Sequence, residues 1–463
     1  MKKILLILIS LCLVFSCNKS FDSNLKPYKV NENIKVYFQE DSELPLISFK
    51  LMIPGGSLDY PSDISHKLSF AWSLLTSSGV KGLSSQDLEL EIEKLSASFS
   101  SGISNEYKYI SFSGLSSDFD QLFNLFFKML ESPSFEEKRV ELLKGQYLES
   151  IKKRKENSQT IASLTLKKLQ FENSVFYNVL NEKDLLKINS DSIKNTYQDF
   201  LHTENAIIAV SGDIKKETLN KYISRLTDFK KKKAIDFRLD KEFEFKKPKI
   251  YFINKPFTQS TILFSQIGPE RMSPDEFRIR GFNRIFGVSG FSSKLVKRIR
   301  TELGLAYSAY GAISPDKDFG SVDIFIQTKS ENAYQSISET LKLIKHLQSI
   351  SLNNKEFTDM HNAATNSLIF RYDTPLKKAM RYAELDIMGY PADFDKQYLE
   401  QIVKVDSNDF NYIINKYINI DEFIIVVVGD ESAYNGLIKA KNEGLLRSYE
   451  IESLGFENEA IFN

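Results

Sequence analysis

The stretch that decides the fold runs from Gly287 to Gly311 and reads G-V-S-G-F-S-S-K-L-V-K-R-I-R-T-E-L-G-L-A-Y-S-A-Y-G. A loop punctuated by Gly287 and Gly290 opens it. Ser292 and Ser293 are then predicted to cap a helix, because their hydroxyls can accept hydrogen bonds from the free N–H groups of its first turn. The stretch therefore predicts a glycine loop that leads directly into a helix.

The helix is predicted to end at Gly304, because glycine readily adopts the left-handed conformation that terminates many helices. The next residues alternate as a strand, which would place Leu305, Tyr307 and Ala309 on one face. Arg300 falls in the last helical turn. One helix–glycine–strand corner is thus expected to bring a guanidinium and a phenol close together.

This corner resembles the C-terminal half of the insulinase/pitrilysin-type metallopeptidases, the inverzincins. In that family an arginine is followed seven residues later by a tyrosine, and Arg300 and Tyr307 have that spacing (307 − 300 = 7). The resemblance implies that both side chains hydrogen-bond the substrate backbone near the scissile carbonyl. The alternative is structural, with Arg300 complementing a helix C-terminus and Tyr307 serving as an ordinary strand aromatic.

Composition and charge place the chain among globular proteins. Its 463 residues are about right for two domains of roughly 200 residues each. Lys+Arg and Asp+Glu both number 61, so no charge imbalance points to a nucleic-acid partner. Aromatic residues make up 12% of the chain, which disfavours disorder and allows large cores.

The N-terminus has the order of a bacterial lipoprotein signal. Two lysines precede an apolar segment, Ile4 to Phe15, that is too short to span a bilayer stably. Leu13-Val14-Phe15-Ser16-Cys17 then resembles a lipobox, although Phe15 is bulkier than the usual residue. We expect residues 1–16 to be a signal peptide and residues 17–29 a tether lipid-anchored at Cys17. The alternative is a plain secretory signal that contains Cys17.

This assignment places the protein in the bacterial cell envelope, on the periplasmic side. Cys12 would be removed with the signal, which leaves Cys17 without a disulfide partner. After Cys17, no apolar run approaches the ~20 residues of a transmembrane helix.

Two segments recur at a nearly constant offset. Residues 207–213 (IIAVSGD) are echoed by residues 424–430 (IIVVVGD), with 424 − 207 = 217, and residues 36–38 by 250–252, with 250 − 36 = 214. This period indicates a duplicated domain and not a short-repeat solenoid. We therefore expect one domain at 30–228, a charged linker at 229–248 and a second domain at 249–463.

The hydrophobic pattern predicts an α+β class with mostly antiparallel sheets. The resemblance adds that two homologous domains face each other across a chamber. Strands are expected at 30–39, 46–53, 107–115 and 206–210, and helices at 66–78, 84–95, 117–130 and 136–156.

The family's zinc motif, H-x-x-E-H, is missing. Two histidines four residues apart lie on one helical face and bind the metal, and the glutamate acts as the base. Counting back from Gly79, where the family has a glycine, places Phe70, Ser73 and Leu74 at these positions, and the downstream ligand falls on Ser150. None of these side chains offers the imidazole, carboxylate or thiolate that zinc needs. The resemblance therefore implies a degenerate metal site and no cofactor on this chain.

No other cluster replaces the motif. Glu149 adjoins Ser150, but on a helix it would point about 100° away. No two of the four histidines (His66, His202, His346 and His361) have ligand spacing. His66, near the start of the predicted helix, is expected to be a surface or capping residue. No Gly-x-x-x-x-Gly-Lys-Ser/Thr loop exists, so the glycine loop is not a nucleotide cradle.

The leading hypothesis is a non-catalytic subunit of an insulinase-type peptidase. A homologous partner would supply Zn²⁺, and this chain would close the chamber and hold an unfolded peptide through Arg300 and Tyr307. The peptide would lie as an added strand on a sheet edge of the partner. A second hypothesis is a non-proteolytic scaffold or peptide-binding lipoprotein that keeps the fold. A third, an independently active metallopeptidase, conflicts with residues 70, 73, 74 and 150.

Overall fold

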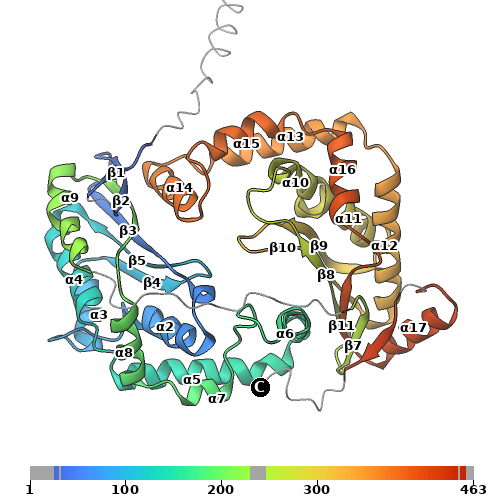
Figure 1. The fold of residues 1–463 in the computed structure, drawn as a ribbon, viewed down its shortest axis with the longest axis horizontal. Helices are drawn as coiled ribbons and strands as arrows, with labels where there is room; N and C mark the ends of the chain where they lie inside the picture. The colour runs from blue at the N-terminus through green and yellow to red at the C-terminus, as the bar shows by residue number, and fades with distance from the viewer. Residues whose placement is uncertain (1–24, 31–32, 230–246, 447–448, 455–463) are drawn as a thin grey trace, which may run out of the picture.

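A computed structural model describes residues 25–30, 33–229, 247–446 and 449–454, which form two six-stranded sheets with flanking helices (Figure 1). Most strand pairs are antiparallel, so the predicted α+β class with mostly antiparallel sheets is confirmed. The proposed signal peptide, Cys17 and most of the linker lie outside the described residues. Among the described residues, no helix combines the length and the apolar character that crossing a bilayer requires.

The first sheet has the order β1-β2-β6-β3-β5-β4. Its strands are β1 (Tyr28–Lys29), β2 (Lys35–Glu40), β3 (Leu46–Pro54), β4 (Ser98–Ile103), β5 (Tyr107–Leu115) and β6 (Ile207–Gly212). The second sheet has the order β12-β7-β11-β8-β10-β9. Its strands are β7 (Ile250–Asn254), β8 (Gln259–Gly268), β9 (Ala306–Ser314), β10 (Gly320–Lys329), β11 (Ile424–Gly429) and β12 (Ile451–Ser453).

The two sheets repeat one plan. Strands β2 to β6 occupy the same order as β7 to β11, and the echoed segments form β6 and β11, both of which pair in parallel with the first strand of their set. The edges differ, because β1 pairs antiparallel with β2 whereas β12 pairs parallel with β7. The internal repeat read from the sequence therefore corresponds to a repeated sheet.

Helices of the first half are α2 (Ser62–Leu74), α3 (Ser85–Lys94), α4 (Phe119–Glu131), α5 (Glu137–Lys153), α6 (Ser158–Phe171), α7 (Glu182–Leu186), α8 (Ser190–Phe200) and α9 (Lys216–Ile223). Those of the second half are α10 (Glu276–Asn283), α11 (Lys294–Val296), α12 (Ala333–Ser349), α13 (Asn354–Ile369), α14 (Pro375–Ile387), α15 (Phe394–Ile402), α16 (Ser407–Tyr417) and α17 (Glu431–Asn442).

Several predicted boundaries were wrong. Helix α2 begins four residues before the predicted start at His66, directly after Pro61, whose fixed φ suits a helix start. The strand predicted from residue 30 begins only at Lys35. Strand β4 was not predicted, because its serines and glycine give no hydrophobic alternation. The start of α3 is as expected, with the Ser84 hydroxyl accepting from the Asp87 N–H.

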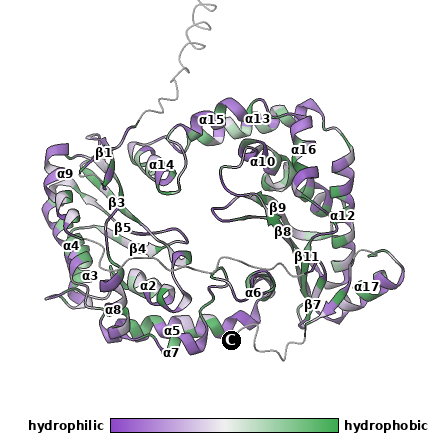
Figure 2. Ribbon diagram, in the orientation of Figure 1, coloured by the Kyte–Doolittle hydropathy of each residue, from purple (hydrophilic) through white to green (hydrophobic). Residues whose placement is uncertain are grey.

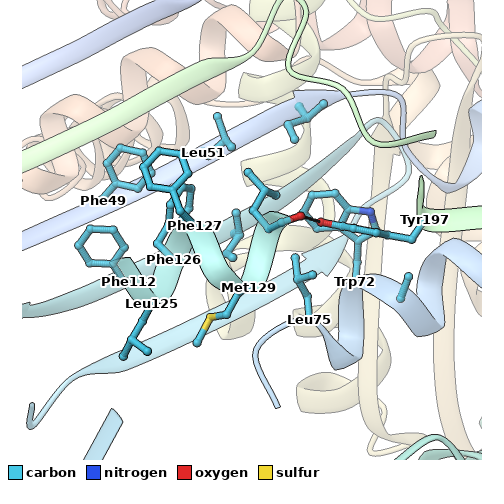
Figure 3. Packing of buried hydrophobic residues seen from close by; sticks show 14 of the residues in the cluster. Phe49, Leu51, Trp72, Leu75, Phe112, Leu125, Phe126, Phe127, Met129 and Tyr197 are labelled. Atoms are coloured by element: carbon cyan, nitrogen blue, oxygen red, sulfur yellow. Dashed lines mark hydrogen bonds between the residues drawn. The ribbon is translucent and has the colours of Figure 1, made fainter. Parts of the chain in front are cut away.

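Aromatic rings fill the core on one face of the first sheet. Phe49 and Phe112 stack with ring centres 5.2 Å apart, and Phe126 of α4 meets Phe49 edge-on at 5.1 Å (Figure 3). Trp72 of α2 lies 6.1 Å from Tyr197, whose hydroxyl donates to the Leu130 carbonyl at 2.7 Å. These contacts hold α2 in place, the helix on which the sequence predicts three of the degenerate metal positions.

The opposite face of each sheet is covered by a helix from the other half of the chain. Helix α14 packs on the first sheet, where the rings of Tyr37 and Tyr382 stack at 6.0 Å. Helix α6 packs on the second sheet, with Ile161 and Ala162 against Val426. The two helices are equivalent in the repeat, since they start 375 − 158 = 217 residues apart. Figure 1 shows this exchange, and Figure 2 shows hydrophobic residues concentrated in the strands between the helices.

Polar contacts also join the halves. The Arg271 guanidinium lies within 2.9 Å of the Glu106 carboxylate on the β4–β5 turn and also pairs with Asp316. Lys35 on β2 pairs with Asp386 of α14 at 2.7 Å. The relative placement of the two sheets is thus set by ion pairs as well as by the exchanged helices.

Candidate functional site

The corner that carries Arg300 is less regular than the sequence predicted. A 3₁₀ turn at residues 290–292 leads into α11 and then into a π-helical segment, Lys297–Glu302. The hydroxyls of Ser292 and Ser293 do not accept N–H bonds. They donate instead, at 2.9 Å to the Ser289 carbonyl and at 2.7 Å to the Gly290 carbonyl. The capping prediction was therefore wrong.

The glycines of this corner have steric reasons. A Cβ on Gly287 would lie 2.3 Å from the backbone oxygen of Gly311, so the loop can approach β9 this closely only without a side chain. Gly304 has φ +62°, the left-handed conformation predicted for the helix end. Gly290 also has positive φ, at +57°. The glycine loop therefore packs against the strand that holds Tyr307.

Tyr307 sits on a β-bulge. Ser308 pairs with Gln327 and Ala306 pairs with Thr328, so two residues of β9 span one step of β10. The extra residue changes the alternation: Leu305 and Ala306 are both buried, whereas Tyr307 is 49% exposed. The predicted shared face of Leu305 and Tyr307 was therefore wrong, because a bulge turns a side chain away from its regular direction.

Arg300 and Tyr307 are both exposed. Within the described part of the chain, neither makes a hydrogen bond or an ion pair, and the contact recorded for Arg300 is its cation–π stack on the Phe291 ring of the glycine loop. Sequence reasoning missed Phe291, although an aromatic residue between Gly290 and Ser292 is a visible signal. The donors of both side chains are thus free to bind a ligand.

Two of the four predicted metal positions are packed and apolar, and the other two are exposed serines. Phe70 and Leu74 are buried on α2, and the Phe70 ring lies 4.9 Å from that of Tyr147 on α5. Ser73 and Ser150 are exposed, as is Glu149. Helix α2 is therefore apolar on two sides, with Trp72 toward the core and Phe70 toward α5.

This donor set does not fit zinc, because a phenyl, an isobutyl and two hydroxymethyl groups replace the ligands and the base. Within the part of the chain that the structure describes, no group of three or more His, Cys, Asp or Glu side chains could hold a metal ion. His66 is buried in the second turn of α2, so its predicted surface or capping role was wrong. Burial lowers the pKa of His66 even though Asp184 opposes the shift.

A pocket of about 720 Å³ lies where the two halves meet. It is lined by residues of the 3₁₀ turn Ser57–Asp59 and the β4–β5 turn (Asp59, Asn105), of α6 (Gln170) and of the second sheet (Tyr310, Asp323). Gln170 donates to the Ser265 hydroxyl at 2.8 Å, and Ser265 donates to Asp323. Burial raises the pKa of Asp323, and the two serine hydroxyls that bond it oppose the shift. Sequence reasoning missed this carboxylate, an acidic residue within an otherwise apolar alternating strand.

Comparisons with known proteins agree with these observations. The family model "Insulinase (Peptidase family M16)" matches residues 35–183, and "Peptidase M16 inactive domain" matches residues 187–363. The "Non-peptidase homolog YmxG" of Helicobacter pylori is 24% identical over 415 residues, covering 88% of this chain and 95% of that protein. The "Uncharacterized zinc protease YmxG" of Bacillus subtilis is 22% identical, covering 79% of this chain and 88% of that one.

Solved structures share the fold. A peptidase M16 inactive domain protein from Pseudomonas fluorescens superposes with a TM-score of 0.78 at 21% identity, covering 88% of this chain and 98% of that one. The periplasmic protease PqqL from Escherichia coli gives a TM-score of 0.72 at 13% identity, covering 88% of this chain and 46% of that one. Because the two family matches together span more than half of its residues, the chain belongs to the insulinase family, peptidase family M16.

Proposed function

We propose that this chain is a non-catalytic subunit of an insulinase-family zinc peptidase, which closes a chamber and holds the substrate peptide while a homologous partner supplies the zinc. One contrast carries the proposal. The positions of the two histidine ligands are filled by the packed apolar side chains of Phe70 and Leu74, whereas Arg300 and Tyr307 remain exposed with unused donors.

The chemistry of this chain would be binding and orientation. A guanidinium presents several N–H donors in a fixed plane, and a phenol presents one O–H, so together they can hold peptide carbonyl groups. Holding a substrate in the reactive geometry lowers the entropic part of the barrier without any bond being made by this chain. The proton transfers and the metal would belong to the partner.

The test is reconstitution with a family member that keeps H-x-x-E-H. The expected result is a stable pair whose peptide turnover exceeds that of the zinc-bearing chain alone, with no turnover by this chain alone. Chelator-washed protein of this chain should contain far less than one zinc per molecule by elemental analysis. Near-stoichiometric zinc, or peptidase activity that a chelator abolishes, would contradict the proposal.

The scaffold hypothesis gives a different result in the same experiment. A scaffold or peptide-binding lipoprotein would leave the turnover of the zinc-bearing chain unchanged, and substitution of Arg300 would then have no kinetic effect. Either hypothesis is compatible with our further proposal that a lipid on Cys17 anchors the chain to a bacterial membrane facing the periplasm.

A further inference from the structure

A second pocket, of about 240 Å³, lies between helices α10, α13 and α15 and the strand β9. Figure 1 shows these three helices next to one another, with β9 below them. Arg280, Arg284 and Arg371 line the pocket, together with Asp395. Three positively charged side chains around so small a volume repel one another unless negative groups balance their charge.

Two of the charges in this cluster are paired. Arg280 binds the Glu276 carboxylate through two nitrogens, at 3.0 and 2.7 Å. Asp395 receives two bonds of 2.6 Å from Arg381 and one of 2.8 Å from the Tyr372 hydroxyl. Both oxygens of Asp395 are therefore occupied, and its charge is balanced by Arg381.

Two arginines are left over. The Arg284 guanidinium donates to the Ser367 hydroxyl at 2.7 Å, and a hydroxyl carries no charge. In the described part of the chain, no carboxylate lies within ion-pair distance of Arg371. Burial lowers the pKa of Arg371, and Arg381 and Arg280 lower it further, against the opposing effect of Asp395. Among the residues that line the pocket, Arg284 and Arg371 are therefore the two cations without an ion-pair partner in the described part of the chain.

The neighbouring polar side chains do not neutralise the charge of Arg284 and Arg371. Asn283 also lines the pocket, but its side chain bonds the Ile313 backbone in both directions, at 2.7 and 2.8 Å. Tyr310 and Ser314 line both this pocket and the 720 Å³ pocket between the halves. The cluster is therefore adjacent to the junction of the two halves.

We infer that the pocket lined by Arg280, Arg284 and Arg371 binds a carboxylate group of a peptide. A planar guanidinium can hold a carboxylate through two parallel hydrogen bonds, and two arginines with no carboxylate partner supply the charge such a group would neutralise. The inference rests on the proposed function only in taking a peptide as the ligand. The carboxylate comes from the C-terminus of the peptide or from an acidic side chain.

The test uses this chain alone and a short unstructured peptide without acidic residues, labelled at its N-terminus with an uncharged BODIPY dye so that the label adds no carboxylate. Three forms are compared by fluorescence anisotropy: a free C-terminal carboxylate, a C-terminal amide, and the amide with one internal glutamate. The free acid should bind about tenfold tighter than the amide, the effect of one charge-assisted hydrogen bond. If the glutamate also restores tight binding to the amide, the pocket accepts a carboxylate from either source; if only the glutamate form binds tightly, the ligand is a side-chain carboxylate.

Arg371→Gln and Arg284→Gln should each bring the affinity for the carboxylate form down toward that of the amide. Arg225→Gln is the matched control, because Arg225 pairs with Glu131 in the first half of the chain, and it should preserve the difference. Equal affinity for all three forms, no measurable binding of any form, or a difference that survives in both variants would overturn the inference. Failure of the zinc-bearing partner to associate would refute the proposed function but leave this binding result standing.

Discussion

The guanidinium carbon of Arg300 lies 4.6 Å from the centre of the Phe291 ring, so the glycine loop supports the arginine that follows it in the chain. Phe291 is 66% exposed, and its ring therefore contributes little to the core. An exposed cation–π contact contributes about 0.5–1 kcal/mol. Such a contact restricts where the guanidinium can point without occupying its N–H donors.

Phe291→Ala should lower the kcat/KM of the reconstituted pair by about two- to fivefold, because it releases Arg300 from this stack. Phe291→Tyr keeps an aromatic ring and should retain the wild-type rate. The measurement is peptide turnover with a zinc-bearing homologue, beside thermal melts of both variants. A loss that tyrosine does not rescue would show that Phe291 acts in some other way.

Arg300→Ala should reduce the kcat/KM of the same pair by about one to two orders of magnitude, because a charge-assisted hydrogen bond contributes roughly 1.5–3 kcal/mol. Tyr307→Phe removes one neutral hydroxyl and should have a smaller effect. Neither change should lower Tm, since both side chains are exposed. Unchanged turnover with a lowered Tm would make the pair structural and support the scaffold hypothesis.

Phe70→Ala should destabilise the protein by about 3–5 kcal/mol, because it leaves a cavity where a fully buried ring contacts Tyr147. Ser73→Ala, one turn along the same helix, is the matched control and should change the free energy of unfolding by less than about 0.5 kcal/mol. Chemical denaturation measures both. Equal effects at the two positions would mean that the degenerate metal site is not a packed structure.

Asp395 should make the protein sensitive to acid. Burial raises the pKa of Asp395, but the bonds from Arg381 and Tyr372 outweigh it and hold the pKa below the ordinary value. A depressed pKa in the folded state contributes stability above the unfolded-state value of about 3.9, and this contribution is lost as pH falls through the folded-state value. Asp395→Asn should cost on the order of 3 kcal/mol at neutral pH, because it leaves Arg381 partly buried and unpaired.

The measurement for Asp395 is the free energy of unfolding of both proteins from neutral pH to below pH 4. The difference between wild type and Asp395→Asn should shrink as the carboxylate of the wild type is protonated. A difference that is independent of pH would show that the cost comes from packing and not from the charge of Asp395.

Cys17→Ala should abolish fatty-acid labelling and release the protein from membranes, if residues 13–17 act as a lipobox. Expression in a bacterium with labelled fatty acid, followed by membrane fractionation, measures both. If the fatty-acid label and the membrane association both survive the substitution, the lipobox interpretation is wrong and the plain secretory signal remains.

The repeated architecture could be predicted from the sequence because the strands at both ends of each repeat are continuous apolar segments, as in β6 and β11. The helix end at Gly304 was also predictable, because glycine is the residue that most readily adopts the left-handed conformation found there. Strand β4 could not be predicted, because it forms by pairing with β5 and its own serine-rich composition does not favour a strand.

The position of the corner that holds Arg300 and Tyr307 was predictable but its geometry was not, and the role of these two residues in binding substrate stays a prediction. The spacing of Arg300 and Tyr307 located the corner, yet the bulge that turns Tyr307 outward depends on the register between β9 and β10. The pocket of Arg280, Arg284 and Arg371 could not be found either. Arg280 and Arg284 lie one turn apart in α10 and its π-helical continuation, but Arg371 comes from the turn that follows α13. A single sequence does not reveal that these residues meet or which charges are paired in three dimensions.

The exchange of α6 and α14 has a consequence for how the molecule holds together. A fragment ending before residue 229 would lack the helix that shields Tyr37 and Ala209, and a fragment beginning after it would lack the one that shields Val426. Each fragment would therefore expose an apolar sheet face that the whole chain buries. The duplicated chain has the arrangement of a domain-swapped dimer whose two protomers have been fused, so that its assembly does not depend on concentration.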